Sequence, residues 1–304
     1  MNPPGDGPEI PWPGIAAPMT LVPPGLQAMA VSAFFFSLMG ALAKLAGESV
    51  PLFEIVLARS LVVGVLSGAK LVADGNGFGG GEPRILVLRG VLGFVSLSCF
   101  YYAVIQLPLA DATVIHFTNP VFTAIIAALW LREHLGPREW LLVVTSLSGV
   151  VLVARPAFLF DEGDSLADFP VLIGLCGAVL AAGAYVAVRR LRQEPPMLIV
   201  FYFAAVCTLL SLPMVALDFV MPSWGTLLVL LGVGVTTHLG QVFVTWGFRL
   251  ERAGRASAVG YLQIVFAALW GWLLFAELPD VWTWVGAAVI VACTLALVRL
   301  HPVR

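Results

Sequence analysis

Long uninterrupted stretches of apolar residues dominate the chain from about residue 26 onward. Most cover roughly 20 residues, the length that a helix needs to cross the ~30 Å hydrocarbon core of a bilayer. The runs are continuous rather than alternating, which argues against an outer-membrane barrel. We therefore predict an all-α polytopic membrane protein with ten transmembrane helices, at about residues 26–46, 52–71, 85–105, 112–131, 139–154, 170–188, 197–217, 225–247, 256–275 and 282–299.

The second half of the chain repeats the first at a constant offset of 144 residues. The informative matches are those between uncommon residues, which are Pro51 with Pro195, Glu133 with Glu277 and Trp140 with Trp284. Five helices per repeat bring the chain to the opposite side of the membrane, so the second repeat enters inverted. The expected organisation is a disordered tail (1–25), a first five-helix repeat (26–155), an acidic outward-facing connection (156–169) and a second five-helix repeat (170–300).

Composition supports the membrane class and excludes several others. The chain is 60% hydrophobic and only 11% charged, whereas soluble domains carry about 25% charged residues. Its mean hydropathy is +0.97. The four cysteines lie in apolar runs without metal-ligand spacing, and we find no nucleotide-binding fingerprint. We therefore expect no metal, no cofactor and no nucleic-acid partner.

Lysine and arginine fall mainly on one side of the predicted topology. Thirteen lie on the side of the N-terminus, Arg89 among them, and two, Lys44 and Arg155, lie on the other side. Because cytoplasmic loops are enriched in Lys and Arg, both termini should be cytoplasmic. We expect a multi-pass protein of the inner or plasma membrane.

The stretch "IHFTNPVFTAI" places polar residues inside a predicted span. His116, Asn119 and Thr123 share one helical face, and Pro120 removes the hydrogen bond to the carbonyl of His116. Polar groups at membrane depth tend to face a bundle interior or a water-filled cavity. The pattern fits a solute site. A proline kink, with His116 and Asn119 bonding to neighbouring helices, remains the alternative.

Further polar side chains lie in other spans, where they either contact solute or bridge helices. Arg59 lies near the midplane of the second helix and must face protein or water, so it either anchors an anionic group or pairs within the protein. Gln263 matches Asn119 at the offset of 144. The candidate substrate-binding residues are Arg59, Tyr101, Tyr102, His116, Asn119, His238, Gln241, Trp246, Tyr261 and Gln263.

Two further pairs suggest other roles. Lys44 and Glu54 flank a tight turn at similar depth, so we expect an ion pair and treat them as candidates for coupling or gating. Glu133 and Glu277 end matching helices at opposite faces. Their symmetry favours a structural role, as interface anchors or caps of helix N-termini, alongside the structural Pro120.

A family resemblance adds to this interpretation. "YYAVIQLPLADATVIHFTNPVFTAIIAALWLREHLGPREWLLVVTSLSGVVLVARP" and "ASAVGYLQIVFAALWGWLLFAELPDVWTWVGAAVIVACTLAL" resemble the ends of the two repeats of EamA-type transporters in the drug/metabolite transporter superfamily. The second copy departs from the first by Ile264 in place of Pro120. The resemblance covers about residues 26–300 and implies ten helices, two inverted repeats, a central cavity and transport of small metabolites.

These observations predict a secondary transporter that moves a small organic metabolite, amino-acid-like or an organic anion, by alternating access. An intramembrane enzyme and a non-transporting receptor or scaffold are the alternatives. "REHLG" is not an HExxH zinc site, and no Asp lies inside a predicted helix, so we expect no enzyme. The expected partners are the substrate and the lipid bilayer. Proton coupling through His116, His238 or Glu54 stays open, as do the substrate, the direction of transport and the oligomeric state.

Overall fold

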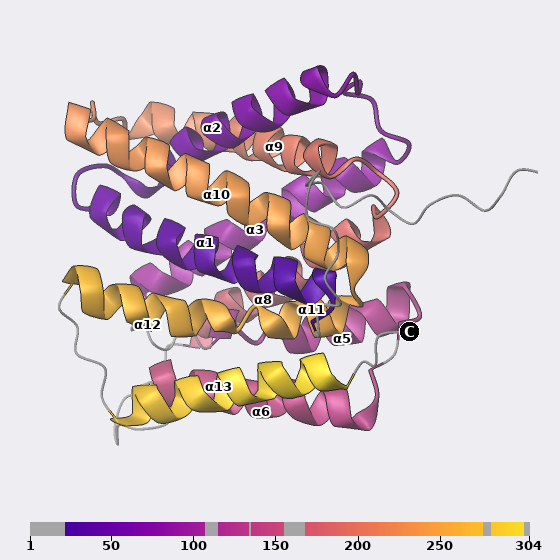
Figure 1. Cartoon of the computed structure of the whole chain (residues 1–304). Coiled ribbons are helices and arrows are strands. Elements are labelled where there is room, and N and C mark those ends of the chain that lie inside the picture. Colours follow the sequence, from indigo (N-terminus) through magenta and orange to yellow (C-terminus); the bar gives the residue numbers. More distant parts are fainter. Residues whose placement is uncertain (1–21, 107–114, 134, 155–167, 276–280, 301–304) are drawn as a thin grey trace, which may run out of the picture.

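The computed structural model describes residues 22–106, 115–133, 135–154, 168–275 and 281–300, and this part of the chain is helical without strands. Figure 1 shows the helices running side by side as one bundle. In chain order the helices are α1 (Pro24–Gly47), α2 (Leu52–Ala73), α3 (Pro83–Gln106), α5 (Asn119–Trp130), α6 (Pro137–Ala154), α8 (Asp168–Arg190), α9 (Pro196–Leu217), α10 (Trp224–Leu250), α11 (Ala253–Val259), α12 (Leu262–Phe275) and α13 (Val281–Arg299).

Local sequence explains where many helices begin. α1, α3, α6 and α9 each start on a proline, a residue suited to the first helical position because its fixed φ fits the helix and no N–H is lost. Pro51 and Pro195 occupy the N-cap positions of α2 and α9. These prolines match at the offset of 144, so the same residue type opens the second helix of both repeats.

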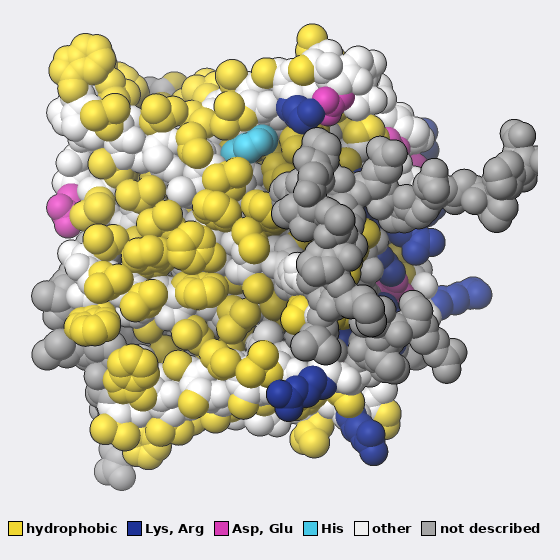
Figure 2. All heavy atoms as spheres, in the orientation of Figure 1, with side chains coloured by type: hydrophobic (Ala, Val, Ile, Leu, Met, Phe, Trp, Pro, Cys, Tyr) yellow, Lys and Arg dark blue, Asp and Glu magenta, His cyan; other side chains and the backbone are white. Residues whose placement is uncertain are grey.

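The outer surface of the bundle is apolar. Among the described residues, seven helical segments are long and apolar enough to cross a membrane. Large side chains such as Leu129, Leu217 and Trp224 are 79%, 85% and 86% exposed. Figure 2 shows hydrophobic side chains spread across this face, with Lys and Arg side chains toward one end. An exposed apolar surface of this kind is stable in contact with lipid, because lipid tails are apolar as well. The chain is therefore a multi-pass membrane protein.

Packing between the helices follows the internal repeat. The offset relates α1 to α8 and α3 to α10, and α1 packs on α10 as α8 packs on α3. α2 packs on its counterpart α9, and α6 packs on its counterpart α13. Glycine permits the closest of these contacts, because a Cβ on Gly286 of α13 would lie 2.5 Å from the carbonyl oxygen of Gly149 on α6. Close approach at small residues is typical of helix packing in membranes.

The fourth span of each repeat is broken, where the sequence predicts uninterrupted helices over 112–131 and 256–275. In the first repeat the helix breaks at Phe117 and Thr118, just before Pro120. In the second repeat α11 ends at Val259 and α12 begins at Leu262. The breaks lie at equivalent positions of the two repeats. The prediction of continuous helices is therefore wrong at these two points.

Both ends of the described chain lie at the same end of the bundle (Figure 1). A Cβ on Gly25 would lie 2.9 Å from the Cβ of Glu251, and Arg255 donates to the carbonyl of Leu297 at 2.5 Å. The start of α1 and the end of α13 thus meet the α10–α11 junction. Glu277 and most of the predicted tail and acidic connection lie outside the described residues.

Candidate substrate-binding cavity

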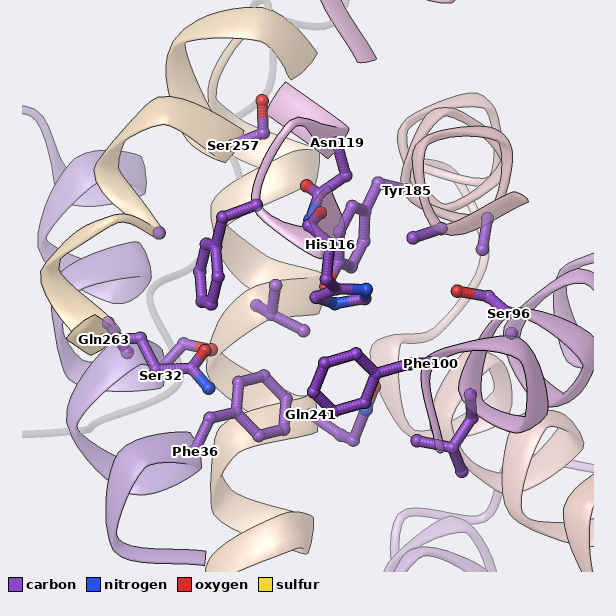
Figure 3. Close-up of a pocket in the computed structure, with 18 of the residues that line it drawn as sticks. Ser32, Phe36, Ser96, Phe100, His116, Asn119, Tyr185, Gln241, Ser257 and Gln263 are labelled. Carbon is purple, nitrogen blue, oxygen red and sulfur yellow. The ribbon is translucent and has the colours of Figure 1, made fainter. Parts of the chain in front are cut away.

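A cavity of about 230 Å³ lies in the centre of the bundle, between helices of both repeats. Figure 3 shows its polar and aromatic side chains converging from several helices and from the two helix breaks. Ligand pockets for drug-sized molecules measure about 300–1,000 Å³, so this volume suits a smaller molecule. The side chains used below are Ser32, Met39, Arg59, Arg89, Phe100, Tyr101, His116, Asn119, Tyr185, Phe203, Gln241, Phe248 and Gln263.

Six of the ten candidate binding residues line this cavity, namely Arg59, Tyr101, His116, Asn119, Gln241 and Gln263. The other four do not line it. Tyr102 is 38% exposed and packs edge-on against Phe169. Trp246 lies under the guanidinium of Arg249, at 4.9 Å. Tyr261 is fully buried in the apolar cluster between α6 and α13, and His238 is half-buried on α10.

Asn119 satisfies the carbonyl that Pro120 leaves without its helical partner. Its Nδ2 donates to the carbonyl oxygen of His116 at 2.9 Å. The expectation that this carbonyl is an open acceptor is therefore wrong, because the adjacent amide already fills it. The Oδ1 of Asn119 is left to accept from another donor. The His116 ring packs against Phe100 at 4.5 Å, and its Nδ1 has no hydrogen-bond partner within the described chain.

Two arginines line the cavity, although the sequence predicts only one. The sequence predicts Arg89 among the Lys and Arg residues on the N-terminal side of the membrane, but its side chain is 3% exposed and lines the cavity. Its Nη2 donates to Oε1 of Gln241 at 2.9 Å, and its guanidinium lies 3.7 Å from the centre of the Phe203 ring. The sequence signal that could have identified Arg89 as a cavity residue is its position inside the apolar run 85–105.

Arg59 has weaker contacts. It is 5% exposed, and its Nη1 lies 4.0 Å from the sulfur of Met39. The Nε atoms of Arg59 and Arg89 are buried without hydrogen-bond partners among the described residues. The described residues that line the cavity include no carboxylate. An arginine at the bilayer centre costs at least ~2.5 kcal/mol on insertion scales, so two guanidinium groups without a carboxylate partner in the described lining favour an anionic ligand.

A polar network closes the end of the bundle where α10 meets α11. Glu133 accepts from Nε of Arg189 at 2.8 Å and from the backbone N–H of Ala253, the first residue of α11, at 3.1 Å. Arg189 also donates to the carbonyl of Arg249 at 2.7 Å and to that of Phe248 at 3.3 Å. The pair thus bonds the last turn of α10 and the first turn of α11 together. This geometry is that of a helix cap, the kind of role expected for Glu133.

A second cluster lies beside it. Glu139 on α6 pairs with Arg252 at 2.5 Å and with the fully buried Arg255 at 3.3 Å. Glu251 lies 3.5 Å from Arg255. Arginines at this end of the bundle therefore hold α6, α10 and α11 together.

Glu54 bonds to a residue that is distant in the sequence. Its carboxylate is buried and accepts from the backbone N–H of Val220 at 3.1 Å. The expected ion pair of Glu54 with Lys44 stays a prediction. Val220 lies between α9 and α10, so Glu54 bonds across the repeats.

A helical bundle of two inverted repeats, with a broken helix of each repeat at a central cavity, is the architecture of secondary transporters. The chain belongs to the EamA-like transporter family, whose sequence profile matches residues 23–155 and again residues 168–299. The two matches are consistent with the two repeats, and the predicted superfamily is confirmed.

Named relatives agree with this class. The chain is 38% identical to a pseudopaline exporter of Pseudomonas aeruginosa, with 92% of this chain and 98% of the relative covered. It is 32% identical to human solute carrier family 35 member G1, over 88% of this chain and 77% of that protein. An S-adenosylmethionine uptake transporter of Rickettsia felis is 28% identical over 71% of this chain and 72% of its own length.

A solved crystal structure shares the fold, with a TM-score of 0.77 and 20% identity over 91% of this chain and 97% of the other. The family and its named members are transporters. The chain is accordingly a membrane transporter of small metabolites and not an enzyme.

Proposed function

We propose that the protein is a secondary transporter that binds a small organic metabolite, amino-acid-like or an organic anion, in the central cavity. Alternating access would expose the cavity to each side of the membrane in turn. The observation that carries this proposal is that both helix breaks border one cavity, each with an amide beside it, Asn119 in the first repeat and Gln263 in the second. Discontinuous helices in matching positions typically hold the substrate of such transporters.

We infer that the protein lies in the inner or plasma membrane with both termini in the cytoplasm. Without Arg89, twelve Lys and Arg residues remain on the side of the N-terminus against two on the other side, so the positive-inside bias is retained. The named relatives include both an exporter and an uptake transporter. Those names therefore support neither direction of transport over the other.

We propose His116 as the group for proton coupling. Of the three groups considered for that role, His116 alone lines the cavity. His238 lies outside the lining, and the carboxylate of Glu54 accepts a backbone hydrogen bond at 3.1 Å. Histidine is the side chain whose ordinary pKa lies closest to neutral pH.

The test begins with the purified protein and a metabolite library. Compounds that raise the melting temperature are then assayed for flux into proteoliposomes, with Asn119→Leu as the variant. In a background without native cysteines, cysteine replacing His116, Asn119 or Gln263 should react with a water-soluble thiol reagent. Cysteine replacing Val121, which packs in the apolar cluster instead, is the matched control. The assignment is wrong if position 119 is inert in every state or if the variant transports normally.

A further inference from the structure

The two arginines that line the cavity come from consecutive helices of the first repeat. Arg59 comes from α2 and Arg89 from α3, and both line the cavity. At the offset of 144, Phe203 stands in the place of Arg59 and Val233 in the place of Arg89. The second repeat therefore has no cation at either position, and among the described lining residues both arginines belong to the first repeat.

Arg89 is held in place by groups that leave its charge unneutralised. The Phe203 ring supports its planar face at 3.7 Å, and Gln241 accepts one hydrogen bond at 2.9 Å. Gly93 makes room for this arrangement, because a Cβ there would lie 2.6 Å from Phe203 and 3.1 Å from Nη1 of Arg89. An aromatic ring and a neutral amide orient a guanidinium without cancelling its charge. The remaining donors can then bind a carboxylate in the fork geometry that arginine favours.

The described lining residues from α1, α8, α10 and α12 carry no charged side chain. They include the amide of Gln263, the hydroxyl of Ser32 and the stacked rings of Tyr185 and Phe248, whose centres lie 4.9 Å apart. A molecule that contacts these groups as well as the arginines carries anionic groups together with a neutral or apolar part. A ligand with a single negative charge would leave one guanidinium buried without a counter-ion.

We propose that Arg59 and Arg89 form a two-cation subsite, so that the substrate carries two anionic groups, such as two carboxylates, toward α2 and α3. This inference rests on the proposed function, because it names the substrate class of the same cavity. Arg89 is then a specificity-determining residue. It sets the preference for a dianion over a monoanion, while Asn119 and Gln263 contact the rest of the molecule.

The experiment uses pairs of compounds that differ by one charge at nearly constant size. We would measure binding and proteoliposome uptake of succinate against succinamate, and of glutamate against glutamine, together with the library compounds that stabilise the protein and their monoamides. The variants are Arg89→Gln and Arg59→Gln. Arg190→Gln is the matched control, because Arg190 pairs with Glu82 at the exposed end of the bundle.

The wild type should bind at least one dianion about tenfold or more tightly than its monoamide, the effect expected for one charged hydrogen-bonded contact. Arg89→Gln should abolish that preference and leave the affinity for the monoamide within about threefold. Arg190→Gln should keep the preference. Arg89→Lys should recover part of it, since lysine restores the charge without the fork.

Two failures are distinguishable. If library compounds are transported but no dianion exceeds its monoamide, or if Arg89→Gln keeps the preference, the two-cation subsite is wrong and the transporter stands. If no compound binds or is transported by the wild type, the proposed function fails and the subsite fails with it. A misfolded Arg89→Gln protein is recognised by its melting temperature, and Arg59→Gln then tests the same preference.

Discussion

Arg189 and Arg190 are neighbours on α8, and they should differ sharply in their contributions to stability. Arg189 makes hydrogen bonds to Glu133 at 2.8 Å and to the carbonyls of Arg249 and Phe248 at 2.7 Å and 3.3 Å. The side chains of Arg189 and Glu133 are only 11% and 19% exposed. Arg190 pairs with Glu82 at 3.2 Å, and those side chains are 48% and 36% exposed.

The expected magnitudes follow from this difference. A hydrogen bond to a charged group contributes about 1.5–3 kcal/mol, and breaking a buried ion pair costs about 3–5 kcal/mol. Arg189→Gln keeps some hydrogen-bonding capacity and the pair is partly solvated, so we expect a loss of about 2–4 kcal/mol. An exposed ion pair contributes about 0–1 kcal/mol, which is the loss expected for Arg190→Gln. The two substitutions change charge and length identically.

The assay is thermal unfolding of each variant in one detergent, followed by tryptophan fluorescence. Arg189→Gln should lower the melting temperature by several degrees, and Arg190→Gln should leave it nearly unchanged. Glu133→Gln should resemble Arg189→Gln, and the double variant should lose less than the sum of the two, because the partners share one interaction. Equal melting temperatures for the two arginine variants would refute the role of this network in joining α10 to α11.

Three further predictions concern the cavity, the packing and the topology. Asn119→Leu should weaken substrate binding by about 1–3 kcal/mol, or roughly 5- to 150-fold, measured as the dissociation constant of a stabilising compound. Unchanged affinity would mean that Asn119 has only a structural role in the proline kink. Gly234→Ala should lower the melting temperature, because the added Cβ would lie 2.4 Å from the Cβ of Val62. Gly40→Ala should leave the melting temperature unchanged, because a Cβ at that position meets nothing within 4 Å. Reporter fusions at Asp164 and Arg304 should report opposite sides of the membrane, and the ten-helix topology is wrong if both report the same side.

Much of the fold could be predicted from the sequence because the bilayer imposes a simple rule. Apolar runs long enough to span it must be helical, since no water is present to satisfy an open backbone. The offset of 144 residues, with Pro51 matching Pro195, predicted the repeats and their inversion. Asn119 and Gln263 could be related in the same way, and both line the cavity.

The candidate site could be predicted only in part, because a polar residue in a span has several ways to be satisfied. Tyr261 and His116 are similar in their sequence surroundings, yet Tyr261 is enclosed by the apolar cluster between α6 and α13 and His116 lines the cavity. Helical periodicity gives the face of one helix. It does not say which neighbouring helix covers that face. The packing of neighbouring helices is what separates the four candidates outside the cavity from the six that line it.

The sequence by itself determined the membrane class, the repeat and the family, because each depends on local hydrophobicity or on matching residues along the chain. Only the tertiary structure decided that Arg89 joins Arg59 in the cavity, that Glu54 bonds to Val220, and that Asn119 fills the carbonyl of His116. These outcomes depend on which side chains of distant helices meet. A buried charge or amide takes the partner that the packing of the helices brings to it.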